Sequence, residues 1–129
     1  MPMRVSSRMN SREMLAITDR YAALLESNGA VPRRVDVERN FRLPADRMVL
    51  LNHARWQLEM VRRVVHRLGG ESTAIRLFGS AQGLMVAAGL LTVAETWREN
   101  AQWLDGASVR AFDTAIQELD QEPSRADCT

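Results

Sequence analysis

The chain has 129 residues, of which 46% are hydrophobic and 26% are charged, and its formal net charge is +1. This size fits one domain with its own hydrophobic core, and the small net charge argues against a dedicated nucleic-acid surface. All seventeen basic residues are arginine, so the sequence excludes a lysine-dependent phosphate loop and a lysine Schiff-base enzyme.

Cysteine usage and hydropathy indicate in which cellular compartment the protein resides. The single cysteine, Cys128, excludes an intramolecular disulfide and a cysteine-based zinc site. Residues 1–10 are basic, but no apolar segment follows them as in a secretory signal. No apolar run approaches the roughly 20 residues that cross a bilayer. We therefore expect a cytoplasmic protein without a membrane anchor.

Helical periodicity runs through almost the whole chain, and no alternating β-branched run indicates a strand. The expected fold is all-α, a single compact bundle of about five helices with the second helix at its centre. We expect a flexible N-terminus over residues 1–10, the bundle over residues 11–121 and a disordered tail over residues 122–129.

The first helix is expected from about Ser11 to Ser27. Asn10 and Glu13 have the spacing of a capping box, and Gly29 is a natural stop. A long connection over residues 29–43, rich in proline and charge, follows this helix. Its apolar residues indicate that it packs on the surface: Val31, Val35, Val37 and Phe41.

The second helix is expected from near Pro44 to Gly69 and Gly70. Its apolar residues span roughly 220° of the helix surface, much wider than the stripe of an ordinary surface helix, so we expect neighbours on two sides. One stripe contains Leu50, Leu51, Ala54, Leu58, Val61, Val65 and Leu68. The other contains Val49, Trp56, Met60 and Val64, with His53 among them.

The third helix, expected from near Ser72 to Gly89, places Gly79, Gly83 and Ala87 one turn apart. Each glycine inside a helix costs roughly 1 kcal/mol against alanine. Small residues at this spacing let two helix backbones approach closely, which can offset that cost. The stripe therefore predicts a close crossing within the bundle, or self-association with a second copy or a partner helix.

The last two helices are amphipathic. Thr92 and Glu95 form the capping box of the fourth helix. This helix is expected to bury Val93, Trp97, Ala101 and Leu104. After a turn, the fifth helix is expected to bury Val109, Phe112, Ile116 and Leu119.

The candidate partner-binding residues are Trp56, Met60 and Trp103. Trp103 projects away from the apolar side of the fourth helix, whereas Trp56 and Met60 share the second stripe of the central helix. Tryptophan and methionine are favoured at protein contacts because they bury large areas and tolerate repacking. The alternative is that these side chains complete the core.

Catalytic groups are missing from the pattern. His53 and His66 point in different directions on one helix, and His53 has no carboxylate beside it to orient a general base. We expect His53 to be a hydrogen-bonded core residue. The carboxylates are scattered singly, without the clustering that metal or glycoside chemistry requires. We therefore expect no catalytic residue, no cofactor, no metal and no enzyme activity.

Two other functions remain open. The segment from Gln82 to Asn100 superficially resembles a helix-turn-helix of a DNA-binding regulator, with Gly89 in the turn. Against this, Glu95 stands where a buried residue is needed. The second alternative is a small-ligand-binding helical protein that uses the apolar space beside His53 and Trp56.

Three clusters carry a family resemblance. They read LNHARWQLE at Leu51–Glu59, IRLFGSAQG at Ile75–Gly83 and LLTVAETWREN at Leu90–Asn100. In this order they resemble the small all-helical bacterial proteins of the QslA type, the quorum-sensing anti-activators. The resemblance implies a regulator that binds a LuxR-family (LasR-type) transcription factor, at its ligand-binding domain, and blocks its dimerisation or DNA binding. It also implies a homodimer. Residues outside about 50–100 are not covered by it.

Overall fold

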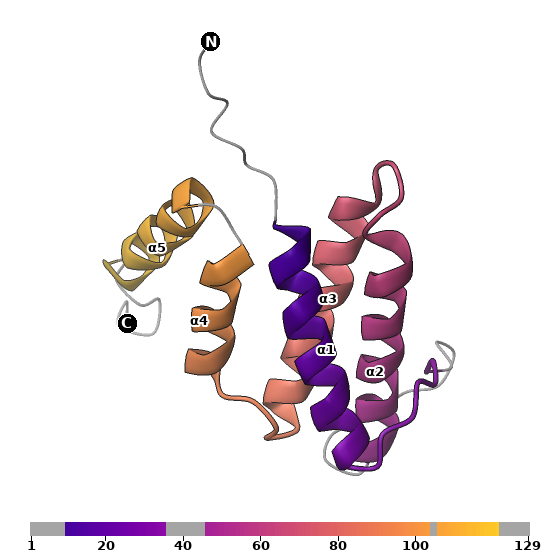
Figure 1. The fold of residues 1–129 in the computed structure, drawn as a ribbon. Coiled ribbons are helices and arrows are strands. Elements are labelled where there is room, and N and C mark those ends of the chain that lie inside the picture. Colours follow the sequence, from indigo (N-terminus) through magenta and orange to yellow (C-terminus); the bar gives the residue numbers. More distant parts are fainter. Residues whose placement is uncertain (1–9, 36–45, 104–105, 122–129) are drawn as a thin grey trace, which may run out of the picture.

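A computed structural model describes residues 10–35, 46–103 and 106–121, except for the side chains of residues 106–109 and 111–113. Every regular element in these ranges is an α-helix (Figure 1). The helices are α1 (Ser11–Ser27), α2 (Arg47–Val64), α3 (Gly70–Ala87), α4 (Val93–Trp103) and α5 (Gly106–Gln121). The expected all-α fold is confirmed.

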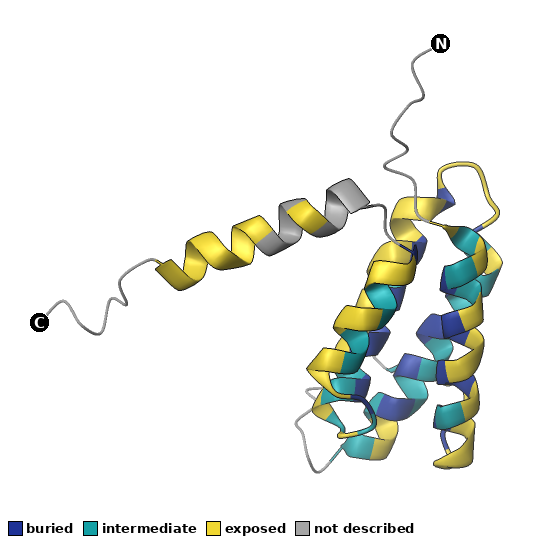
Figure 2. Cartoon of the chain, turned by 60° about the vertical axis from the view of Figure 1, so that its left-hand side comes forward, coloured by how far each residue is buried: buried dark blue, intermediate teal, exposed yellow. Residues whose placement is uncertain are grey.

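Helix α2 packs against both α3 and α1, as expected for a central second helix, and α4 packs against α1. Helix α5 extends away from the bundle (Figure 2). The expected N-terminus over residues 1–10 and tail over residues 122–129 lie, apart from Asn10, outside the described residues.

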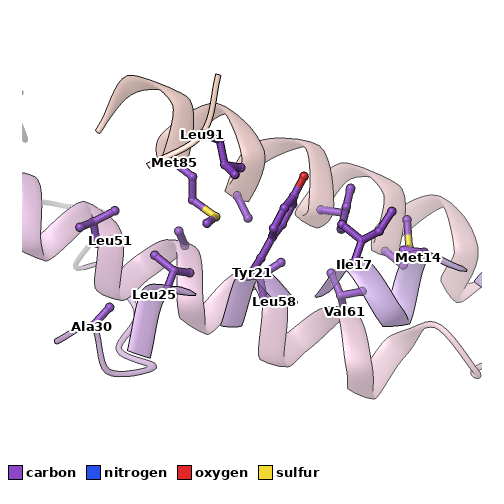
Figure 3. Close-up of a cluster of buried hydrophobic side chains, with 14 of the residues drawn as sticks. Met14, Ile17, Tyr21, Leu25, Ala30, Leu51, Leu58, Val61, Met85 and Leu91 are labelled. Atoms are coloured by element: carbon purple, nitrogen blue, oxygen red, sulfur yellow. The ribbon is translucent and has the colours of Figure 1, made fainter. Parts of the chain in front are cut away.

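The core lies between α1, α2 and α3, with side chains from each (Figure 3). From the first stripe of α2, Leu51, Ala54, Leu58, Val61 and Val65 are buried, as expected. Leu50 is only half-buried. Leu68 is fully exposed, because α2 ends at Val64, earlier than the sequence indicated. The second stripe is half-exposed and not enclosed, so the wide apolar arc was only partly used for the core.

The starts of α1 and α4 follow the sequence signals closely. Asn10 accepts a hydrogen bond from the Glu13 backbone N–H, and Thr92 and Glu95 bond each other's backbone N–H groups. The turn between α2 and α3 needs glycine because a Cβ on Gly70 would collide with the Val64 carbonyl. Pro44, the expected start of the second helix, lies outside the described residues.

Residues 30–35 run along α2 as a backbone-bonded strap. Val31 N–H donates to Asn52 Oδ1 over 2.9 Å, and Arg33 N–H donates to the Asn52 carbonyl over 3.3 Å. The Arg55 guanidinium donates to the Ala30 carbonyl over 2.5 Å. Of the strap's apolar residues, Ala30 is buried in the core, Val35 is half-buried and Val31 is exposed, so the expected packing of Val31 is not seen. Val37 and Phe41 lie outside the described residues.

Candidate interaction surface

Polar side chains attach α4 to the bundle. Gln82 on α3 donates from Nε2 to Asn100 Oδ1 over 2.7 Å and to the Tyr21 hydroxyl over 3.0 Å. Tyr21 in turn donates to Glu99 Oε1 over 3.1 Å, and Arg20 forms an ion pair with the other Glu99 oxygen. Burial, aided by the Glu99 charge, raises the pKa of Tyr21 far above 10, so its hydroxyl stays protonated and can donate. Three helices therefore meet at one connected polar network.

Trp103 is buried in this attachment, with 4% of its surface exposed. Its ring meets Phe78 edge-on at a centroid distance of 5.4 Å, and its Nε1–H donates to Asn100 Oδ1 over 3.2 Å. A buried, hydrogen-bonded indole completes the core. Trp103 is therefore not part of an exposed contact surface, which corrects its selection as a partner-binding candidate.

Burial of Trp103 turns the expected apolar side of α4 outward. Val93 is 67% exposed, Trp97 is 40% exposed and Ala101 is also exposed. The prediction that this helix buries these residues was wrong, because Trp103 and Glu99 face inward and decide the rotation of the helix. Leu104 lies outside the described residues.

Helix α5 shows a similar reversal. Ile116 is 39% exposed and Leu119 is 60% exposed, although the sequence predicted that both would be buried. All the side chains described on α5 are exposed, since the helix leaves the bundle (Figure 2). The side chains of Val109 and Phe112 lie outside the description.

The small-residue stripe on α3 is open. Gly79, Gly83 and Ala87 are exposed, and a Cβ added to either glycine would meet no atom within 4 Å. A close crossing by another helix would fill that space. Within the described part of the chain, the stripe therefore serves no intramolecular crossing, and the expectation of one was wrong.

Two apolar rows lie on either side of the Gln82–Asn100 hydrogen bond. On α3, Ile75, Gly79 and Val86 share the side of Gln82, at intervals of three or four residues. On α4, Val93 and Trp97 share the side of Asn100 by the same spacing. We call these two rows the α3–α4 face. Its apolar side chains stay exposed or half-buried, so α3 and α4 meet at their polar bond without closing over it.

Trp56 and Met60 lie half-exposed on the second stripe of α2. The Trp56 ring stacks on His53 at 5.4 Å, and the Arg34 guanidinium carbon lies 5.5 Å from its centroid. Val49, one helical heptad before Trp56, is exposed. We call Val49, Trp56 and Met60 the α2 outer face.

His53 is hydrogen-bonded, as expected, but half-exposed instead of buried in the core. Its Nδ1 accepts a hydrogen bond from the Val35 backbone N–H over 3.1 Å, which ties the strap to α2. Burial and the Arg34 charge lower the pKa of His53 below 6.5. The imidazole is therefore neutral at neutral pH and its role in this structure is that of an acceptor.

A shallow hollow lies at the α2–α3 turn, between residues that include His66, Arg67, Leu68, Ile75 and Arg76. Neither His53 nor Trp56 lines it, so it is not the apolar space that the ligand-binding alternative invoked. In the described ranges no three His, Cys, Asp or Glu residues gather as metal ligands. No helix among the described residues combines the length and apolarity needed to cross a membrane.

The residues that sequence reasoning missed are those of the polar network: Tyr21, Gln82, Glu99 and Asn100. The available signal was Gln82, the one long polar residue in the second half of α3, where its neighbours are small or apolar. Comparison with known proteins finds no matching family model, no matching curated protein and no matching solved structure.

Proposed function

We propose that this chain is a non-enzymatic cytoplasmic regulator that acts by protein–protein contact. Its partner is the ligand-binding domain of a LuxR-family (LasR-type) quorum-sensing transcription factor, whose dimerisation and DNA binding it blocks. The resemblance of residues 51–59, 75–83 and 90–100 to the anti-activators carries the identity of the partner. No catalytic step and no cofactor are part of the proposal.

The three resembling clusters fall on different helices. Residues 51–59 lie on α2, residues 75–83 lie on α3, and residues 90–100 run into α4. Each cluster contributes both to the core and to exposed surface, Trp56 and Trp97 being among its outward residues. The likeness therefore includes surface residues, where a binding function resides, as well as core residues that any helical bundle needs.

The α2 outer face is the proposed contact with the receptor. Trp56 is held between His53 and Arg34, so its ring is ordered before binding and little rotamer freedom remains to be lost. Met60 and Val49 add apolar surface beside it. An ordered tryptophan with methionine next to it is the composition typical of a contact hot spot.

The proposed mechanism requires only that the protein bind the receptor monomer and not the receptor dimer. An inhibitor that binds only the receptor monomer lowers the concentration of free monomer, so the receptor dimer dissociates by mass action. The extent of inhibition then depends on the concentration of this protein relative to its dissociation constant from the receptor.

The test is size-exclusion chromatography with light scattering on the protein, a purified LuxR-type ligand-binding domain and their mixture. We expect a mixed complex with fewer receptor copies than the receptor's own dimer. Met60→Glu should weaken this complex at least tenfold, because it places a charge in the α2 outer face. Ala16→Glu, an exposed change on α1, is the matched control. An intact receptor dimer and no mixed complex would rule out the proposal for that receptor.

A further inference from the structure

The α2 outer face carries two arginines whose charge the described part of the chain leaves unpaired. Arg34, on the strap, has its guanidinium carbon 5.5 Å from the centre of the Trp56 ring. Arg63 follows Met60 on α2 and is exposed. Neither guanidinium forms an ion pair or donates a hydrogen bond among the described residues. Both therefore keep N–H donors that can bind a carboxylate of another molecule.

The groups beside these arginines do not compensate their charge. Glu59 stands four residues before Arg63, at the spacing of a helix-surface ion pair, but it pairs with Arg62 instead. On the other side, α3 meets α2 through uncharged groups, where Gln57 donates from Nε2 to Ser80 Oγ over 2.8 Å. The charge left over along the α2 outer face is therefore positive.

The two arginines lie toward opposite ends of the apolar surface. The strap is bonded to α2 at Asn52 and His53, just before Trp56, and places Arg34 over the Trp56 ring. Arg63 comes two turns after Trp56, which is about 10 Å along the helix axis. Two carboxylates separated by about two turns of one helix span the same distance, with room for an apolar side chain between them. An acidic amphipathic helix therefore matches this face in charge and in spacing.

We propose that the α2 outer face receives an acidic amphipathic helix of the partner protein, in which two carboxylates bind Arg34 and Arg63 and an apolar side chain between them packs on Trp56. The identity of that partner rests on the proposed function, whereas the chemistry of the helix rests on these side chains alone. Charge pairs at the rim of a contact chiefly govern the rate of association and the choice of partner. The arginines would thus select the helix that the apolar surface then holds.

A single-stranded nucleic acid is the other polyanion that tryptophan and arginine recognise, and the geometry of Trp56 disfavours it. Such strands bind by stacking their bases on open aromatic rings. The Trp56 ring is already stacked on His53, with ring centroids 5.4 Å apart and an angle of 22° between the planes, and the Arg34 guanidinium lies over it. A stacked base would have to displace one of these two groups, whereas an apolar side chain can pack beside them.

The first experiment titrates the isotope-labelled full chain with a synthetic helical peptide and follows the NMR signals, including that of the Trp56 indole N–H. The peptide carries a leucine between two glutamates that are about two helical turns apart. We expect a dissociation constant below about 1 mM at about 50 mM NaCl. The same peptide with glutamine in place of both glutamates should bind at least about fivefold more weakly, because it lacks both charge pairs. An oligothymidine strand is titrated under the same conditions.

The matching variants are on the protein. The double variant Arg34→Gln and Arg63→Gln should bind the acidic peptide at least about fivefold more weakly and should bind the glutamine peptide as the wild type does. Because both arginines are exposed and without an ion pair in the described chain, their loss leaves the core intact. The control, Arg12→Gln, removes one charge at an exposed position on α1 and should not change binding.

The second experiment uses the mixture of the full chain with the LuxR-type ligand-binding domain. Every basic residue of this chain is arginine, so Arg63→Lys gives it a single side-chain amine and keeps the positive charge. A carbodiimide joins an amine to a carboxylate only where the two are in direct contact. We expect this variant to cross-link to the receptor domain, and the attachment site then identifies the acidic residue of the docked helix. Arg12→Lys, the matched control on α1, should give no cross-link to the receptor domain.

The results separate this inference from the proposed function. Peptide binding that is absent, or equal for the glutamate and glutamine forms, would overturn the inference, and so would tighter binding of the oligothymidine strand. A receptor complex that forms without a cross-link from the Arg63→Lys variant would also overturn it, while the proposed function stands. Charge-dependent peptide binding without any receptor complex would support the inference and rule out the proposed function for that receptor.

Discussion

Helices α1 to α3 and helices α4 to α5 all carry apolar sides, yet the structure uses these sides differently. In the first group the apolar residues pack against one another, with Leu58 and Phe78 fully buried. In the second group Trp103 and a polar network hold α4, and the apolar residues Val93 and Leu119 are exposed. An apolar stripe thus indicates that a helix has a side to cover, but not which element covers it.

The comparison also separates two kinds of attachment. Apolar burial holds α2 against its neighbours over much of its length, so no single contact decides its position. The position of α4 depends on a small set of directed hydrogen bonds around Gln82. Such bonds set the rotation of a helix more sharply than apolar burial does, because they have geometric requirements. Their loss should therefore affect α4 before the rest of the bundle.

The largest expected effect is the loss of Phe78, which is fully buried between Tyr21 and Trp103. Phe78→Ala should lower the free energy of unfolding by about 3–5 kcal/mol, through lost burial and the cavity left behind. Leu119→Ala, measured at a concentration where the chain is monomeric, should change it by less than about 0.5 kcal/mol. Urea unfolding followed by circular dichroism measures both. Equal losses of unfolding free energy in the two variants would contradict the distinction between the two regions.

A smaller effect is expected from the polar network. Gln82→Leu removes the donor shared by Tyr21 and Asn100, leaving buried groups without that bond, and should cost about 1–3 kcal/mol. We expect hydrogen exchange to accelerate in α4 before it does in α2. The conservative change Gln82→Glu tests whether the donor is what matters, since a carboxylate cannot donate to Asn100 Oδ1. Uniform acceleration over all helices would contradict a local role.

A substitution in the glycine stripe should raise the free energy of unfolding, whereas the two changes above lower it. Gly83→Ala meets open space and removes a helix-interior glycine, so it should stabilise the monomer by up to about 1 kcal/mol. The matched change Gly70→Ala should destabilise, because its Cβ would collide with the Val64 carbonyl. Thermal melts at low protein concentration compare the two. A destabilised Gly83→Ala monomer would mean that a neighbouring element does use that space.

The smallest expected effect is a pH dependence from His53. Its folded-state pKa lies below the ordinary 6.5, chiefly through burial, so the unfolded chain binds the proton more readily. The contribution to stability is complete above pH 6.5 and is lost as the pH falls through the lower, folded-state pKa. Protonation also removes the acceptor for the Val35 N–H. His53→Gln should flatten this part of the pH profile of stability, measured by urea unfolding at a series of pH values.

Local signals in the sequence predicted the helix ends well. The hydrogen bonds of Asn10 and Thr92 and the stop at Gly29 depend on residues within one turn of each other, so they can be read without the rest of the chain. The α2 core stripe was also predictable, because a helix with neighbours on two sides must bury an apolar row. The α2–α3 boundary was less accurate, since helix ends fray over a few residues.

The candidate surface was predicted less well. Sequence reasoning assigned Trp103 to the outside and Val93 to the inside, and the structure has them reversed. Periodicity places Trp97 and Trp103 on different sides of α4, but it does not say which side meets α1 and α3. That choice depends on Gln82 and Tyr21, which lie far from α4 in the sequence.

The sequence by itself determined the helices, their caps, the apolar row of α2 and the absence of lysine chemistry, since each follows from neighbouring residues or from composition. Only the tertiary structure decided which way α4 is rotated, that Gly79 and Gly83 open outward, and that α5 leaves the bundle. The physical reason is that helix periodicity is local, whereas the rotation of a helix is set by hydrogen bonds and burial between residues distant in the chain, such as Gln82 with Tyr21 and Asn100.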